Sequence, residues 1–330
     1  MLQDLSPYKN VPEFIYGITR EIWEDRGIGV KLDKYYAPNI KLRAPTGYTG
    51  SNLGVTAQTL QTLHQFPDRQ LIGEDVIWQP YADGSFLSSH RLVSVMTHTG
   101  DGIYGEAQGR PVRSRIIADC WVRDKVVVEE WLVRDQAAFA NCMGTSAQEM
   151  ARAQADTELQ SGKPISFFKP EHDQPTQCPF KVDADQAVAK YVQGLHDIWN
   201  EKNTAAISTA YFHGANVFAP GGHTHYGHAD IDRFIISYLA SLPDAKLTVH
   251  SAFINRDAEQ PLRIAARWSL SGTHTGWGHF GQPSGAPLYI MGLSHAHMTQ
   301  GKVMNEWITF DEVSIWKQIY AHQTTHCAAR

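Results

Sequence analysis

The sequence predicts an α+β protein built from two copies of one domain. Glu130-Trp131 returns 176 residues later as Glu306-Trp307, and the tetrapeptide Thr-His-Thr-Gly occurs at the same offset, at 97–100 and 273–276. A period this long exceeds that of solenoid repeats and indicates a tandem pair of domains. Within each copy, helical patterns come first and a run of strand patterns follows, which is typical of an α+β fold.

Each copy is expected to begin with two helices and to end with a short one. Apolar residues recur at helical spacing in the first helix of each copy. A Pro-Asp pair follows the second, and proline cannot continue a helix. The expected helices are Phe14–Ile22, Thr56–Gln65 and Gln136–Met143 in the first copy and Val188–Ile198, Ala229–Leu242 and Glu312–Tyr320 in the second.

Between the second helix and the last, the apolar period changes from 3.6 to two, which predicts strands. Two residues separate the last two strands of each copy, Asp124-Lys125 and Gln300-Gly301, and this spacing predicts a tight hairpin. The expected strands are Arg91–Val95, Arg113–Val122 and Val126–Val133 in the first copy and Arg263–Trp268, Tyr289–His297 and Lys302–Phe310 in the second.

A chain of 330 residues has room for two domains of about 150 residues, each able to bury its own core. We expect the first domain over residues 1–150 and the second, which is rich in histidine, over residues 184–330. Residues 151–183 are expected to form a linker that contains a short helix and then a proline-rich extended stretch.

Composition narrows the classes of partner. The net charge is −5 and no basic stripe is present, so a nucleic-acid partner is not expected. No apolar run approaches the roughly 18 residues of a membrane span, and the N-terminus lacks the apolar core of a signal peptide. The four cysteines form no C-x-x-C pair, which favours reduced thiols in the cytoplasm. We expect a cytoplasmic protein with a small-molecule substrate, able to form a homo-oligomer.

The C-terminal half of each copy has one pattern: G-x-P, an aliphatic strand, a tight turn, E-W-x-x-x-D and a short apolar helix, starting at Gly109 and again at Gly285. This pattern resembles that of the SnoaL-like polyketide cyclases of the nuclear transport factor 2-like superfamily. The resemblance implies two cones, each a curved antiparallel sheet packed against its N-terminal helices around a pocket, arranged as an intrachain pseudo-dimer. It also implies acid/base catalysis without a cofactor, by an aspartate that corresponds to Asp135 and Asp311.

Asp135 and Asp311 also have a simple structural interpretation. Each directly precedes a short apolar helix, where aspartate is a favoured N-cap. A carboxylate that faces an apolar pocket has a raised pKa and can accept a proton from the carbon next to a carbonyl. The capping role and the catalytic role can coexist.

The hairpin register suggests a second set of catalytic candidates. With a regular two-residue hairpin, His295 lies opposite Glu306 and Asp119 lies opposite Glu130. The first pair suits proton transfer near neutral pH, and two adjacent carboxylates raise the pKa of one of them. The alternative is a solvated pair on the outer face. A slip of one residue would send His295 towards Trp307.

Several residues at matched positions are candidates for contacting substrate. Recurrent tryptophans favour core packing, and strand arginines suit either a substrate carboxylate or a structural acid. The histidines of the Thr-His-Thr-Gly repeats fit a turn equally well. The candidates are Trp131, Trp307, Tyr36, Phe212, His98, His274, Arg91 and Arg267.

Eleven of the sixteen histidines lie from His213 onward. On a strand, the two imidazoles of an H-x-H motif point the same way and can bind one metal ion. This pattern makes a divalent metal such as zinc in the second domain an alternative to a cofactor-free site. The candidate ligands are His223, His225, His228, His295 and His297.

The leading hypothesis is a cofactor-independent cyclase, isomerase or hydrolase that acts by acid/base catalysis on a small or medium carbonyl or ester compound in a conical pocket. The second copy, with Asp311, His295 and Glu306, is the expected active pocket. A metal-dependent hydrolase or lyase and a non-catalytic small-molecule-binding protein are the alternatives.

Overall fold

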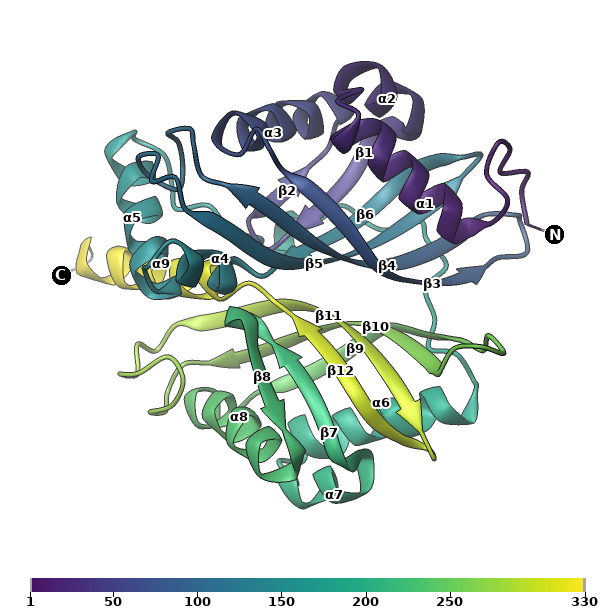
Figure 1. Cartoon of the computed structure of the whole chain (residues 1–330). Helices are drawn as coiled ribbons and strands as arrows, with labels where there is room; N and C mark the ends of the chain where they lie inside the picture. The colour runs from purple at the N-terminus through teal and green to yellow at the C-terminus, as the bar shows by residue number, and fades with distance from the viewer. Residues whose placement is uncertain (1, 329–330) are drawn as a thin grey trace.

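The computed structural model describes residues 2–328, with side chains described for residues 2–325. Two six-stranded sheets lie face to face, and helices cover the outer side of each sheet (Figure 1). The predicted α+β class and the duplicated architecture are confirmed. None of the helices within residues 2–328 is both long and apolar enough to cross a membrane.

The two sheets have the same strand order, β2-β1-β6-β5-β4-β3 and β8-β7-β12-β11-β10-β9. In each sheet one pair, β1 with β6 and β7 with β12, is parallel and the other pairs are antiparallel. The strands of the first sheet are β1 Tyr36–Ala44, β2 Gly47–Thr49, β3 Gln70–Pro80, β4 Phe86–Thr97, β5 Pro111–Arg123 and β6 Val126–Arg134. Those of the second are β7 Tyr211–Ala219, β8 His223–Tyr226, β9 Lys246–Asn255, β10 Leu262–Thr273, β11 Pro287–Thr299 and β12 Lys302–Thr309.

Three of the helices that close the two cones begin at residues whose side chains cap them. The side chains of Asn10, Ser51 and Asp185 accept hydrogen bonds from backbone N–H groups that a helix start leaves free. In the first domain the helices are α1 Val11–Thr19, the π-helical turn η1 Arg20–Glu24, α2 Ile28–Tyr35 and α3 Asn52–Gln65. In the second they are α6 Gln186–Trp199, η3 Thr204–Ala206, α7 Ile207–Ala210, η4 Pro220–Gly222 and α8 Gly227–Ser241.

Three further helices pack together at one end of the two sheets (Figure 1). They are α4 Gln136–Cys142, α5 Ala147–Gln160 and α9 Glu312–Ala328. The chain after α5 is extended except for the short η2 Pro170–His172, and it is bound to both domains: Phe168 N–H donates to the Pro45 carbonyl at 2.8 Å, and Val182 bridges to Ala252. The predicted linker therefore forms part of the packed structure.

Buried side chains from both sheets meet in one apolar cluster between the domains, which includes Trp131 and Phe253. Two arginines reach across this interface in a pseudo-symmetric way. The Arg91 guanidinium lies 3.7 Å from the ring centre of Trp307, and that of Arg267 lies 4.6 Å from the ring centre of Trp131. The tandem domains thus form an intrachain pseudo-dimer, sheet against sheet.

The two predicted hairpin loops are confirmed, because Arg123 pairs with Val126 and Thr299 pairs with Lys302. The loop residues have positive φ, as a type I′ turn requires. The predicted cross-strand pairs are wrong, however. Each hairpin contains a β-bulge, and the extra residue shifts the register by one.

The bulges change which side chains share a face. His295 pairs with Trp307 instead of Glu306, and Glu306 pairs with Ala296. In the first domain Asp119 pairs with Trp131 instead of Glu130, which pairs with Cys120. Because neighbouring strand residues point to opposite faces, Asp119, His295 and both tryptophans point towards the other domain, and Glu130 and Glu306 point into the cones.

Arg91→Met is expected to lower the free energy of unfolding by about 2 kcal/mol, because Arg91 is buried and its Nε lies 2.8 Å from the Glu74 carboxylate. The loss stays moderate since Arg115 also binds Glu74. Urea unfolding measures the change. Arg123→Met removes a solvent-screened pair with Asp83 and is the control that should have little effect. Equal losses in both variants would contradict an interface that depends on Arg91.

Candidate functional site

The cone of the first domain encloses a pocket of about 750 Å³, including space open to solvent. Its walls come from α1, η1, α3 and the inner face of the sheet, and they are largely apolar. Nine polar residues interrupt this lining, and four of them are the neutral side chains of Thr19, Gln58, Thr59 and Thr62. The other five can ionise: Tyr36, Arg69, His90, Glu130 and Arg134.

Glu130 lies on β6 with 5% of its surface exposed. Burial raises the pKa of this carboxyl group to about 7, although a hydrogen bond from Tyr36 and the charge of Arg134 oppose the rise. A carboxyl group with such a pKa exchanges a proton readily near neutral pH, which is the property of a general base.

Tyr36 and His90 complete the polar wall near Glu130. Tyr36 is buried at the start of β1, and burial together with the Glu130 carboxylate raises the pKa of its hydroxyl, so it stays a hydrogen-bond donor. Burial lowers the pKa of His90 to about 4, so the imidazole is neutral at physiological pH. Within the described residues, His90 Nδ1 has no hydrogen-bond partner. A neutral imidazole thus has one unused polar atom in the pocket wall.

Two cationic side chains also border the pocket. Arg69 is buried, and its Nε donates a hydrogen bond to Ser94 Oγ at 3.1 Å. Arg134 stands at the end of β6, and its Nε is buried with no hydrogen-bond partner among the described residues. Burial, and then the charge of Arg134, lower the pKa of Arg69 to about 9.

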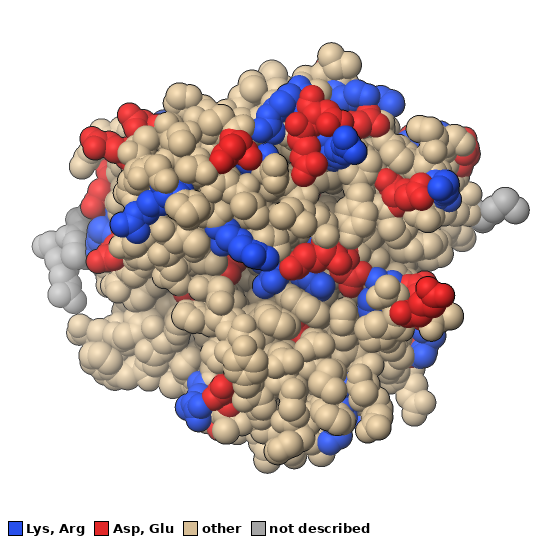
Figure 2. Space-filling model, in the orientation of Figure 1, with Lys and Arg blue, Asp and Glu red and all other residues tan. Residues whose placement is uncertain are grey.

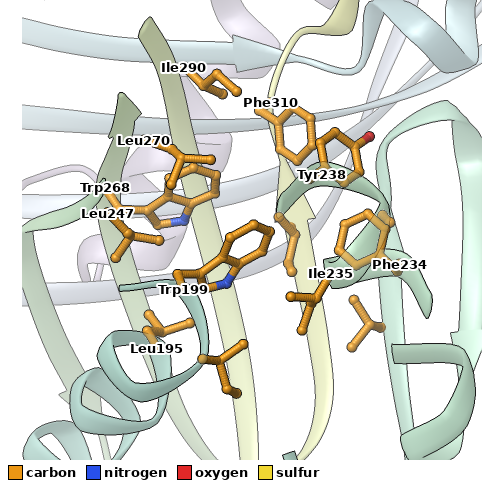
Figure 3. Packing of buried hydrophobic residues seen from close by; sticks show 14 of the residues in the cluster. Leu195, Trp199, Phe234, Ile235, Tyr238, Leu247, Trp268, Leu270, Ile290 and Phe310 are labelled. Atoms are coloured by element: carbon orange, nitrogen blue, oxygen red, sulfur yellow. The ribbon is translucent and has the colours of Figure 1, made fainter. Parts of the chain in front are cut away.

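The cone of the second domain is filled. At the offset of 176 residues, Trp268 stands in place of Leu92 and Phe310 in place of Arg134. Both rings lie in the interior with Trp199 and aliphatic side chains from strands and helices (Figure 3). Gly292 makes room for Trp268, since a Cβ atom there would lie 2.2 Å from the indole ring. The interior of this cone therefore has no room for a substrate beside Glu306. A separate hollow of about 1070 Å³, including space open to solvent, lies between this domain and α4, and its lining includes His223, His225, His279 and Glu312 but not Asp311, His295 or Glu306.

Glu306 is sealed inside this filled cone. Its two carboxylate oxygens accept hydrogen bonds from the hydroxyl groups of Tyr191 and Tyr211, each at 2.5 Å. The side chain is fully buried, and burial raises its pKa. Glu306 is therefore the structural counterpart of Glu130 without the space for a substrate.

Asp135 and Asp311 cap helices, as one interpretation of the sequence predicted. Asp135 accepts a hydrogen bond from the Ala138 N–H at 2.9 Å, and Asp311 accepts one from the Ser314 N–H at 3.2 Å. Asp135 also binds the N–H group of Gly221 in the second domain at 2.9 Å. Burial raises the pKa of Asp135 to about 6 and that of Asp311 to about 7, but both lie at the seam between domains, outside the cone pocket.

Of the eight predicted substrate contacts, Tyr36 borders the cone pocket. The tryptophans and arginines on that list lie at the interface between the sheets, and Phe212 packs on the core of the second domain. His98 stacks on Phe66 with ring centres 5.1 Å apart, and His274 Nδ1 lies 3.0 Å from Ser284 Oγ. These two histidines support loops.

The histidines proposed as metal ligands lie apart. His223 and His225 share β8, and His228 Nε2 lies 3.1 Å from the Tyr211 carbonyl. His295 binds Ser89 at the interface, and His297 Nε2 lies 3.6 Å from the Asp75 carboxylate. Within residues 2–325, no three His, Cys, Asp or Glu side chains are placed to hold one metal ion. Each H-x-H motif places two histidines on one strand, but no third ligand among the described residues lies close enough to complete a metal site.

The sequence reasoning missed Arg69, His90 and Arg134. The sequence does distinguish these three residues, because they are not repeated in the second copy. At an offset of 176 residues, the second copy has Ala245, Ala266 and Phe310 instead. Residues required by the shared fold tend to recur in both copies, so polar residues confined to one copy indicate a site that only that copy has.

Parts of this chain resemble known proteins. The family model described as SnoaL-like polyketide cyclase matches residues 189–319, which lie in the second domain. A search of curated proteins found no match.

Among solved structures, TsrD from Streptomyces laurentii is 16% identical, with a TM-score of 0.37, and the match covers 42% of this chain and 99% of TsrD. IdmH from Streptomyces antibioticus, named as a candidate polyketide cyclase, is 20% identical, with a TM-score of 0.34, over 39% of this chain and 98% of IdmH. In each case the matched share of this chain corresponds in length to one domain.

Glu130→Gln is expected to stabilise the protein above pH 7 and to change little below pH 4.5. The native carboxyl group has a pKa of about 7, against an ordinary value of 4.5, so the stability present below pH 4.5 is lost as the pH rises to 7. Above pH 7 the ionised carboxylate costs up to about 3 kcal/mol. Urea unfolding at pH 4.5, 6 and 8 measures the gain, and a gain that does not vary with pH would contradict the raised pKa.

Trp268→Leu gives the second cone the residue found in the first. Because Trp268 is buried in a filled interior, we expect a loss of about 3 kcal/mol in the free energy of unfolding. Trp277→Leu is the matched control, since 72% of Trp277 is exposed. If the two substitutions cost the same in urea unfolding, the second cone is not filled as described.

Proposed function

We propose that this protein, whose second domain matches the SnoaL-like polyketide cyclase family, is a cofactor-independent acid/base enzyme that works in the cone of its first domain. Its reaction would start with removal of a proton from the carbon next to a carbonyl group. The observation that carries the proposal is Glu130, a buried carboxyl group with a pKa of about 7 that borders the largely apolar pocket of the first cone.

In this mechanism Glu130 in its ionised form accepts the proton, and negative charge moves onto the carbonyl oxygen. His90 is suited to donate a hydrogen bond to that oxygen, because its imidazole is neutral and one ring nitrogen has no partner among the described residues. Tyr36 donates a hydrogen bond to the Glu130 carboxylate and helps to hold it in place. The apolar wall excludes water, which strengthens these interactions.

The bound enolate has two outcomes that need no cofactor. If Glu130 returns the proton to a different carbon, the product is an isomer. If the enolate carbon instead bonds to a second carbonyl carbon of the same molecule, a ring closes, and the new alkoxide takes the proton from Glu130. The second outcome is a cyclisation, the reaction class named by the matching family.

The second domain supports the first in this proposal. Its cone is filled, and its sheet packs on the face of the first sheet that points away from the cone pocket, which fixes the strands that carry Glu130 and His90. On the face drawn in Figure 2, acidic and basic side chains are intermingled, and neither sign dominates a broad area. This surface is compatible with a small-molecule substrate that enters a cone.

Glu130→Gln is expected to slow proton abstraction by about 10²- to 10⁴-fold, the usual contribution of a general base. The measurement is α-hydrogen exchange in D₂O, followed by proton NMR on a panel of aromatic β-keto esters and β-keto acids. In the wild type, the exchange rate should rise as the pH passes about 7 and Glu130 ionises.

Glu306→Gln is the matched control for this assay, because Glu306 occupies the same position in a cone without a pocket. We expect it to keep the wild-type exchange rate. Undiminished exchange in Glu130→Gln, or loss of exchange in Glu306→Gln alone, would overturn the assignment of the active cone to the first domain.

A further inference from the structure

Arg69 and Arg134 line the cone pocket without an acidic partner. The one hydrogen bond that the described residues give the Arg69 guanidinium joins it to the Ser94 hydroxyl, and they give Arg134 none. Two other buried arginines are paired: Arg43 binds Glu129 at 2.9 Å, and Arg91 binds Glu74 at 2.8 Å. A third, Arg267, has no bonded acid among the described residues, but its guanidinium lies over the rings of Trp131 and Phe180 at the domain interface. The cone pocket therefore holds two cations whose charge is not neutralised by a bonded carboxylate.

Two arginines without a bonded acid lower the stability of the folded protein when no ligand is bound. Arg69 is buried and loses hydration, and the half-buried Arg134 repels it, since the charge of Arg134 helps to lower the pKa of Arg69. An anion bound between the two guanidinium groups removes both penalties, and guanidinium groups match carboxylate geometry with paired hydrogen bonds.

The duplicate shows that the fold does not require these arginines. At the matched positions the second domain has Ala245 in place of Arg69 and Phe310 in place of Arg134, and it forms the same sheet order. A structural role common to the fold would appear in both copies. The two cations occur in the copy that has an open pocket, which points to a ligand.

We propose that the substrate carries a carboxylate group, and that Arg69 and Arg134 bind it at one end of the cone pocket while Glu130 acts at the other. This inference rests on the proposed function and names its substrate class. A single carboxylate fits the charges, because two arginines, ionised Glu130 and one substrate carboxylate sum to zero. A phosphate monoester dianion would leave an excess negative charge.

The spacing along β6 sets the length of the substrate. Glu130 and Arg134 lie four residues apart and on the same face of the strand, so their Cα atoms are about 14 Å apart. Both side chains extend into the pocket and shorten this span. The carboxylate and the acidic C–H of the substrate would therefore lie at separate positions along β6.

The test compares two probes of the same size, 2-naphthoate and the neutral 2-naphthamide, by isothermal titration calorimetry on the full chain. We expect naphthoate to bind the wild type at least about 10-fold more tightly than naphthamide. Arg69→Met and Arg134→Met should each weaken naphthoate binding by about 10- to 100-fold and leave naphthamide binding nearly unchanged. Arg152→Met is the control, because Arg152 lies over Tyr320, away from the cone.

The comparison of the two probes on the wild type needs no variant, so a variant that fails to fold leaves the test intact. Equal or absent binding of the two probes, or naphthoate binding that both folded variants retain, would overturn the proposal. Tighter binding of 2-naphthyl phosphate than of naphthoate would overturn the carboxylate assignment. If the wild type does not prefer naphthoate to naphthamide but α-hydrogen exchange still depends on Glu130, only the proposed substrate class is wrong. If the wild type prefers naphthoate but α-hydrogen exchange does not depend on Glu130, the proposed reaction is wrong.

Discussion

The packing of one sheet against the other is the constraint on which the rest of the structure depends. One face of each sheet is buried in this interface. There Arg91 lies over Trp307, Arg267 lies over Trp131, and an apolar cluster packs between the two sheets. Any group that meets a substrate within a cone must therefore lie on the opposite face. The interface therefore contains His295, Asp119, Trp131 and Trp307, although the sequence suggested catalytic or substrate-binding roles for them.

The bulges in the two hairpins and the side chains in the two cones then decide which copy has a pocket. The bulges turn Glu130 and Glu306 inward in the same way, so the duplicated fold offers two equivalent carboxyl groups. Trp268 and Phe310 fill one cone, and two tyrosines bind its carboxylate. The other cone keeps Leu92 and Arg134, which leave room for a ligand. The second cone is therefore filled, and the first cone is open.

The sequence predicted the features that depend on local patterns: the duplication, the hairpin strands and the short helix that end each copy, the helix caps at Asp135 and Asp311, and the two-residue hairpin loops. It did not predict strands such as β1 and β3, whose apolar alternation is interrupted by polar residues. The bulges were also missed, because an extra residue inside a strand looks like one more strand residue. Whether a cone is open depends on contacts between distant residues, such as Trp268 over Gly292, which no local pattern records.

The ionisation of Glu130 in the resting protein tests the central claim most directly. Infrared difference spectra between the wild type and Glu130→Gln isolate the C=O stretch of this one protonated carboxyl group as the pH is varied. Half of the signal should be lost near pH 7, because burial in the cone raises the pKa of Glu130 to about 7. Loss of the signal near pH 4.5 would instead show a well-hydrated carboxylate, which is incompatible with a buried general base in the first cone.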